Sequence, residues 1–79
     1  MYYCLNAEFY DSGKVLACVT SRNSDKKPRD QIRQVHGMTA FRIWLTNKFI
    51  AESLLSSINN GATNINDVLQ IFLDNKVAA

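Results

Sequence analysis

The sequence predicts an α+β fold in which an N-terminal antiparallel β-hairpin packs against two or three α-helices, in the order ββ-α-α-α. Residues 2–21 form two strand-length segments about one tight turn, and pairing them across the turn gathers apolar residues on one face, which is typical of a hairpin. Apolar residues then recur at helical spacing over 39–59 and again over 64–77. A polar, basic connector, 22–37, joins the hairpin to the first of these helices.

Length and composition indicate a single small domain, 1–79. The 79 residues are 47% hydrophobic and 20% charged, which is a globular composition. No apolar run approaches the ~18 residues that a membrane-spanning helix needs, so we expect no membrane association. The N-terminus lacks the basic and then continuously apolar pattern of a secretory signal, so we expect a cytoplasmic protein.

The hairpin turns at Asp11-Ser12-Gly13, because Asp and Ser favour a type I turn and Gly accepts the left-handed residue that follows it. Placing Tyr10 opposite Lys14 fixes the register. The pairs on the inner face are then Phe9 with Val15, Ala7 with Ala17, Leu5 with Val19 and Tyr3 with Ser21. The opposite face holds Tyr2, Cys4, Asn6, Glu8, Tyr10, Lys14, Leu16, Cys18 and Thr20.

This register also makes a prediction about the two cysteines. Cys4 falls opposite Thr20 and Cys18 opposite Asn6, so the two sulfurs are diagonal neighbours. A diagonal pair is usually too far apart for a disulfide. We therefore expect two free thiols.

The connector is expected to be a polar loop that leads into a short helix. Pro28 is suited to the first turn of a helix, and Gly37 to its end. Ile32 and Val35 are the two apolar residues that would anchor this helix.

A long helix is expected over 39–59. Thr39 would be its N-cap, and Asn59-Asn60-Gly61 would end it. Its apolar stripe places Trp44 in the core, against the inner face of the hairpin. The members of that stripe are Phe41, Trp44, Leu45, Ala51, Leu54, Leu55 and Ile58.

A C-terminal helix is expected over 64–77. Asn64 and Asp67 have the spacing of reciprocal N-terminal capping residues, and Asp67 adds a negative charge to the first turn. The apolar stripe consists of Ile65, Val68, Leu69, Phe72, Leu73 and Val77.

Positive charge is concentrated in the connector. Five of the nine Lys and Arg residues lie there, and with Asp25 and Asp30 the connector carries +3, against −1 for the rest of the chain. Clustered cations suit an acidic protein surface or the phosphates of a nucleic acid, and a solvated connector that contacts no partner is a third interpretation. The two acids dilute the cluster and no aromatic residue interleaves for base stacking, so an acidic protein partner is favoured. The predicted patch is Arg22, Lys26, Lys27, Arg29 and Arg33.

Catalytic and metal-binding sites are not expected. His36 is the single histidine, and a remote alternative pairs it with Cys4 or Cys18 in a cysteine-dependent enzyme. Two cysteines and one histidine fall short of a usual zinc set. The three glycines all lie at expected turns rather than in a phosphate-binding loop, so no cofactor is expected.

Association is therefore the expected activity. The leading hypothesis is a non-catalytic protein-interaction module, a small inhibitor or regulator that binds a larger protein in the style of phage or mobile-element accessory proteins. Besides the basic patch, a partner would contact the outer hairpin face at Tyr2, Glu8, Tyr10, Lys14 and Leu16. A homodimer joined through the hairpin edge is a further expectation. The alternative is a small nucleic-acid-binding regulator that uses the stretch 22–33.

Overall fold

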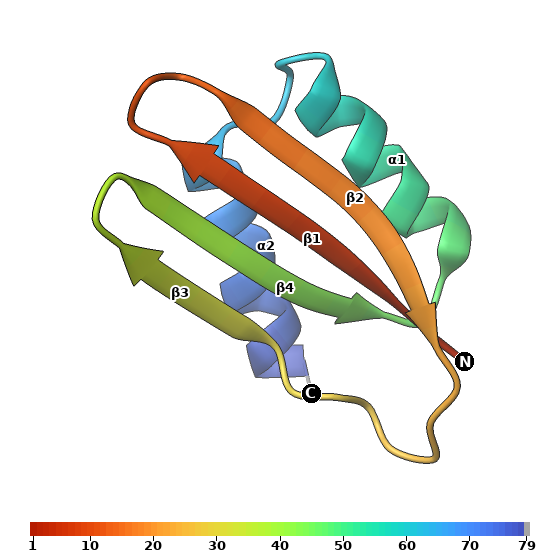
Figure 1. Ribbon diagram of the computed structural model, residues 1–79. Coiled ribbons are helices and arrows are strands. Elements are labelled where there is room, and N and C mark those ends of the chain that lie inside the picture. The colour runs from red at the N-terminus through yellow and green to blue at the C-terminus, as the bar shows by residue number, and fades with distance from the viewer. Residues whose placement is uncertain (79) are drawn as a thin grey trace.

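The protein forms one four-stranded antiparallel sheet with two helices, so the predicted α+β class is confirmed. The computed structural model describes residues 1–78, with side chains as far as Lys76. The sheet order is β2-β1-β4-β3, and both helices follow the last strand in sequence (Figure 1). In chain order the elements are β1 Tyr2–Tyr10, β2 Val15–Arg22, β3 Gln31–Val35, β4 Met38–Leu45, α1 Lys48–Asn59 and α2 Ile65–Ala78.

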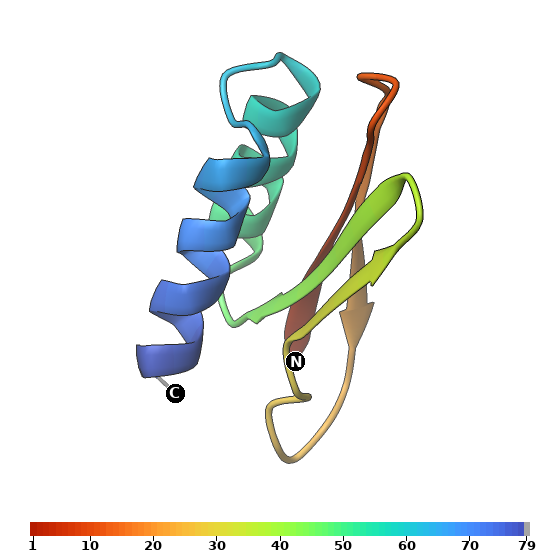
Figure 2. The ribbon, with the colours of Figure 1, turned by 90° about the vertical axis from the view of Figure 1, so that its left-hand side faces the viewer.

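Two layers make up the molecule. Both helices lie on one face of the sheet, and the other face is not covered by any of the described residues (Figure 2). Helix α1 packs mainly on β2 and β1, whereas α2 packs on β4. The side chains that point toward the helices form the core, and those that point away form an outer face.

The predicted hairpin is confirmed, including its register. All of the expected pairs are present, from Tyr3 opposite Ser21 to Phe9 opposite Val15. The Tyr10 N–H donates to the Lys14 carbonyl at 2.9 Å, and Gly13 has φ 93°, in the region that favours glycine. Turn chemistry and alternation were sufficient to specify this unit.

The short helix predicted in the connector is wrong, because residues 31–35 form the edge strand β3. Val35 pairs with Met38 across a two-residue turn, His36-Gly37, in which Gly37 has φ 82°. His36 has no positive φ, so only the second central residue of the turn lies in this region, as in a type II turn. Gly37 therefore closes a hairpin and does not end a helix.

The long helix predicted over 39–59 is also wrong in its first half. Residues 38–45 form β4, which pairs with β1 along its whole length, and the helix begins only at Lys48. Phe41, Ile43 and Leu45 all point inward with the period of a strand, while Trp44 points outward. The expected position of Trp44 in the core is therefore incorrect.

Asn47, and not Thr39, is the N-cap of the helix. Its side-chain oxygen accepts from the N–H groups of Phe49 and Ile50 at 2.9 and 3.2 Å. Helix α1 ends at Asn59, as Asn59-Asn60-Gly61 predicted.

The C-terminal helix is confirmed as α2, which begins one residue later than predicted. The Asp67 N–H donates to Asn64 Oδ1 at 3.1 Å, and the Asn64 N–H donates to Asp67 Oδ2 at 3.4 Å, so the reciprocal cap is present. Val68 and Phe72 are buried, as the stripe requires, but Leu69 and Leu73 are exposed. The Val77 side chain lies outside the described residues.

The core lies between the sheet and the two helices. It consists of Leu5, Ala7, Phe41, Ile43, Ile58, Val68 and Phe72. Phe41 is its centre, with its ring edge-on to Phe9 at 6.1 Å and to Phe72 at 6.3 Å between centroids.

Dimerisation through the hairpin edge stays a prediction, and the sheet order limits it to one strand of the hairpin. Strand β1 is central in the sheet, so β2 is the only strand of the N-terminal hairpin that lies at an edge, and β3 is the other edge.

Neither of the two described helices is long and apolar enough to cross a membrane.

Candidate binding site on the outer face of the sheet

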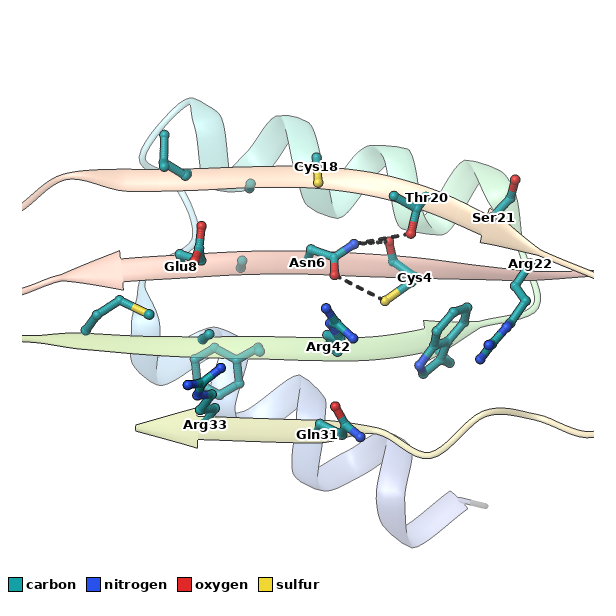
Figure 3. A pocket seen from close by; sticks show the side chains of 17 residues that line it. Cys4, Asn6, Glu8, Cys18, Thr20, Ser21, Arg22, Gln31, Arg33 and Arg42 are labelled. Atoms are coloured by element: carbon teal, nitrogen blue, oxygen red, sulfur yellow. Dashed lines mark hydrogen bonds between the residues drawn. The ribbon is translucent and has the colours of Figure 1, made fainter. Parts of the chain in front are cut away.

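Four strands contribute alternate residues to the outer face of the sheet. The register places them in rows that cross the strands. The first row consists of Leu16, Glu8, Ala40 and Arg33, and the second of Cys18, Asn6, Arg42 and Gln31. The third row consists of Thr20, Cys4 and Trp44, and the last of Arg22 and Tyr2. Figure 3 shows most of these side chains standing on the same face.

Three arginines follow a straight diagonal across these rows. Arg33 on β3 lies one strand and one row from Arg42 on β4, and Arg22 on β2 lies two strands and two rows further on. Sheet geometry gives Cα separations of about 8 Å for the first step and about 17 Å for the second. All three side chains are exposed. The backbone positions of the three arginines therefore reach from one edge strand to the other, and their side chains stand on the same face (Figure 3).

An aromatic residue flanks the diagonal. The Trp44 ring is half-buried on the outer face, and the Arg22 guanidinium lies 5.9 Å from its centroid. At the other end of the face, Lys14 lies over the Tyr10 ring at 5.9 Å. Both cation–π pairs hold a basic side chain against the sheet.

A small hydrogen-bonded group fills the middle of the face. Asn6 Nδ2 donates to Thr20 Oγ1 and to the Cys4 carbonyl, both at 3.3 Å, and Cys4 Sγ donates to Asn6 Oδ1 at 3.6 Å. The Cys4 side chain is buried beneath its neighbours, and this burial raises the pKa of its thiol, against the opposing effect of the nearby Arg42 charge. These contacts fix short side chains where a partner would touch the centre.

The outer face is hollowed. Short side chains at the centre, among them Cys18, Thr20 and Ala40, are surrounded by longer ones, including Arg22, Arg33 and Trp44, and they leave an open depression of about 850 Å³. Glu8 is the one carboxylate among the residues that line it, against three arginines. The depression is therefore polar and positively charged.

The predicted basic patch is divided by the structure. Arg22 and Arg33 lie on the outer face, but Lys27 and Arg29 line a separate, smaller hollow with Pro28 and Phe72. Lys26 is exposed in the loop before them. The five cations therefore do not form one continuous patch.

Asp30 holds the connector in place. Its side chain is 6% exposed and accepts from the Trp44 N–H at 2.8 Å and from Asn75 Nδ2 at 2.7 Å, and Lys27 Nζ lies 3.6 Å away. Strand β3 begins at Gln31, opposite Arg42, so it does not reach Trp44, and the Asp30 carboxylate accepts the hydrogen bond of the Trp44 N–H in place of a strand residue. Asp30 therefore stabilises the connector, and its carboxylate does not lie among the arginines that line the outer face.

The predicted outer hairpin residues all lie on the outer face in the confirmed register, and their contact with a partner stays a prediction. Among the residues of this face, Arg42, Trp44 and Gln31 were not predicted, because 39–59 was interpreted as helix and 22–37 as connector. The alternation of Phe41, Ile43 and Leu45 with Arg42 and Trp44 was the signal that would have placed them.

The structure does not bring His36 to either cysteine. His36 lies in the β3–β4 turn beside the Asp11 loop, since the Asp11 N–H donates to the Gly37 carbonyl at 3.0 Å. Cys4 lies about 20 Å from that end of β1, by the rise per residue of a strand. Within residues 1–78 there is also no cluster of three or more potential metal ligands.

Comparison with known proteins gives no relative: no protein-family model matches the chain, and neither does a curated protein or a solved structure.

Proposed function

We propose that the protein is a non-catalytic binding module whose outer sheet face docks on an acidic surface of a larger protein. The observation that carries this proposal is the diagonal of Arg33, Arg42 and Arg22 on a hollowed face that no described residue covers. Guanidinium groups bind carboxylates through paired hydrogen bonds, so three in line favour an elongated acidic element. By occupying that element the module would act as an inhibitor or regulator.

The composition of the face favours a protein over a nucleic acid. Glu8 lies in the same row as Arg33, where its carboxylate would repel a phosphate backbone. The Trp44 ring is already covered by Arg22, so it is not free as a stacking platform. Leu16 and Met38 add apolar contact area at the end of the hollow, which suits protein side chains.

Single-stranded nucleic acid is the second candidate, because the diagonal also resembles a track for successive phosphates. Displacement of Arg22 from Trp44 onto a phosphate would then free the ring for a base. This candidate requires a steep dependence of affinity on salt.

The test uses the wild-type protein and an Arg42→Glu variant as baits in a lysate of the native host. A partner retained by the wild type and lost with Arg42→Glu is purified, and its affinity is measured by biolayer interferometry at two salt concentrations. We expect charge reversal to weaken binding by about a hundredfold, mainly through faster dissociation. Lys48→Glu is the matched control, since it makes the same charge change at an exposed position of α1.

Anisotropy with labelled single-stranded DNA and RNA distinguishes the second candidate. Submicromolar binding at ~150 mM salt that is lost in Arg42→Glu would replace the protein partner with a nucleic acid. A partner that binds Arg42→Glu and the wild type equally would contradict any role for the outer face.

A further inference from the structure

A second surface, separate from the outer face, is apolar and lies beside the edge strand β3. Ile65, Leu69 and Leu73 follow one flank of α2 at intervals of four residues, with 36, 37 and 45% of their surface exposed. Ile32 on β3 points to the same layer as the helices and is 41% exposed. We name these four residues the β3 flank.

The position of Phe72 and Lys76 shows that this side of α2 faces β3. They lie seven and eleven residues after Ile65, hence on the same side of the helix, and both line a hollow with Pro28 and Arg29 just before β3 begins. Figure 2 looks onto this side, with α2 and the β3 edge both at the front. The apolar side chains between the sheet and α2 are therefore exposed at the β3 edge.

The backbone of β3 is open to pairing at the same edge. The two-residue turn makes Val35 and Met38 a hydrogen-bonded pair, and alternation then directs Arg33 and Gln31 toward β4. The Trp44 N–H, which points to Asp30, agrees with this alternation. The N–H and C=O groups of Ile32 and Gln34 therefore face outward.

We propose that a second copy of the chain occupies this edge, joining two sheets through antiparallel β3 strands on a two-fold axis. With Ile32 on the axis, the two Ile32 residues meet and Gln31 of each copy lies opposite Arg33 of the other, so no like charges are paired. An axis at Arg33 would instead place two guanidinium groups together. Self-complementarity of this strand favours a second copy over an unrelated partner.

The helices complete the interface. A two-fold axis perpendicular to the sheet keeps both helix layers on the same side, so the Leu69 and Leu73 side chains of the two copies approach each other above the paired Ile32 residues. Burial of this apolar flank supplies the favourable free energy that a short edge strand alone lacks. In this dimer the two sheets form one continuous outer face, which carries the arginine diagonal of each copy.

Sedimentation equilibrium over a wide range of concentrations tests the association. We expect the wild type to move from 8.9 kDa to twice that mass as concentration rises. Leu69→Glu should raise the dissociation constant of the dimer by about a hundredfold, since it buries a charge at the interface. Phe49→Glu, at a residue of α1 that is 78% exposed, is the matched control and should leave the constant unchanged.

Cysteine crosslinking tests the register. In a Cys18→Ser background, Ile32→Cys should oxidise to a covalent dimer, because the two residues meet on the axis. Gln34→Cys should not, because its two copies are then about 13 Å apart along the strands. A wild type that stays at the mass of one chain, a dimer unaffected by Leu69→Glu, or faster crosslinking through Gln34→Cys would each overturn the proposal. Circular dichroism of each variant is the control for folding.

Discussion

The two faces of the sheet differ sharply although they are built from the same strands. On the inner face Leu5 and Ile43 are opposite each other and fully buried. One residue further along β1, Asn6 faces the exposed Arg42 on the outer face. Neighbouring residues therefore have separate roles: inner-face residues determine stability, and outer-face residues are free to determine recognition.

The largest expected effect is that of Phe41→Ala on the inner face. Phe41 is 2% exposed and touches both Phe9 and Phe72, so truncation leaves a cavity at the centre of the core. We expect a loss of about 3–5 kcal/mol of unfolding free energy, measured by urea denaturation. Arg42→Ala, the next residue on the same strand, should change it by less than about 0.5 kcal/mol. Equal losses would show that the two faces are not separable.

Asp30→Asn should have the next largest effect. The carboxylate receives donors from three elements: the backbone of β4, the side chain of Asn75 on α2, and Lys27 in the connector. An amide replaces one acceptor oxygen by a donor and removes the charge, so we expect a loss of about 2 kcal/mol in the same urea titration. Asp25→Asn, an exposed neighbour in the connector, should be nearly neutral. An equally neutral Asp30→Asn would mean that the connector does not depend on this residue.

Trp44→Ala tests whether a large aromatic residue on the outer face contributes as much to stability as one on the inner face. Its ring is half-buried and contacts Arg22 rather than the core, so we expect a loss of about 1–2 kcal/mol and a variant that remains folded. The helical position predicted from the sequence would have made this substitution as damaging as Phe41→Ala. A measured loss above that of Phe41→Ala would place the ring in the core after all.

The sequence predicted those parts of the fold that local chemistry determines. The first hairpin follows from a three-residue turn and from the apolar pairs that the turn places on one face, and the α2 cap follows from Asn64 and Asp67. Strand β3 gave no such signal, because all five of its residues are exposed and an edge strand with little burial need not alternate. This edge of the sheet was therefore absent from the prediction.

Strand β4 was missed for a different reason. Phe41 and Leu45 are four residues apart, which suits one face of a helix as well as one face of a strand. The β1–β4 pairing decides between them, and it joins residues more than 27 positions apart, for which one sequence carries no direct signal. The candidate site was incomplete as a consequence: Arg22 and the outer hairpin residues were predicted, but Arg42 and Trp44 were not.

The smallest expected effect concerns Cys4, which lies on the outer face and is nevertheless buried. Burial raises the pKa of its thiol above the ordinary value, so in alkaline solution the thiol ionises in the unfolded chain before it ionises in the native one. The native state then binds more protons than the unfolded state, and the unfolding free energy must fall as pH rises through that ordinary value. The effect is absent at neutral pH, where both states are protonated. Urea titrations between neutral pH and about pH 10 should show a steeper fall for the wild type than for Cys4→Ala.

Cys18→Ala is the control for this measurement, because Cys18 is exposed and its removal should leave the pH dependence as it is. The two thiols should differ in the same sense toward a thiol reagent at neutral pH: Cys18 reacts at once, and Cys4 reacts only as fast as the native structure opens. If Cys4→Ala kept the full alkaline loss of stability, the buried thiol would not be its source. The hydrogen-bonded group of Cys4, Asn6 and Thr20 would then be more open to water than its geometry indicates.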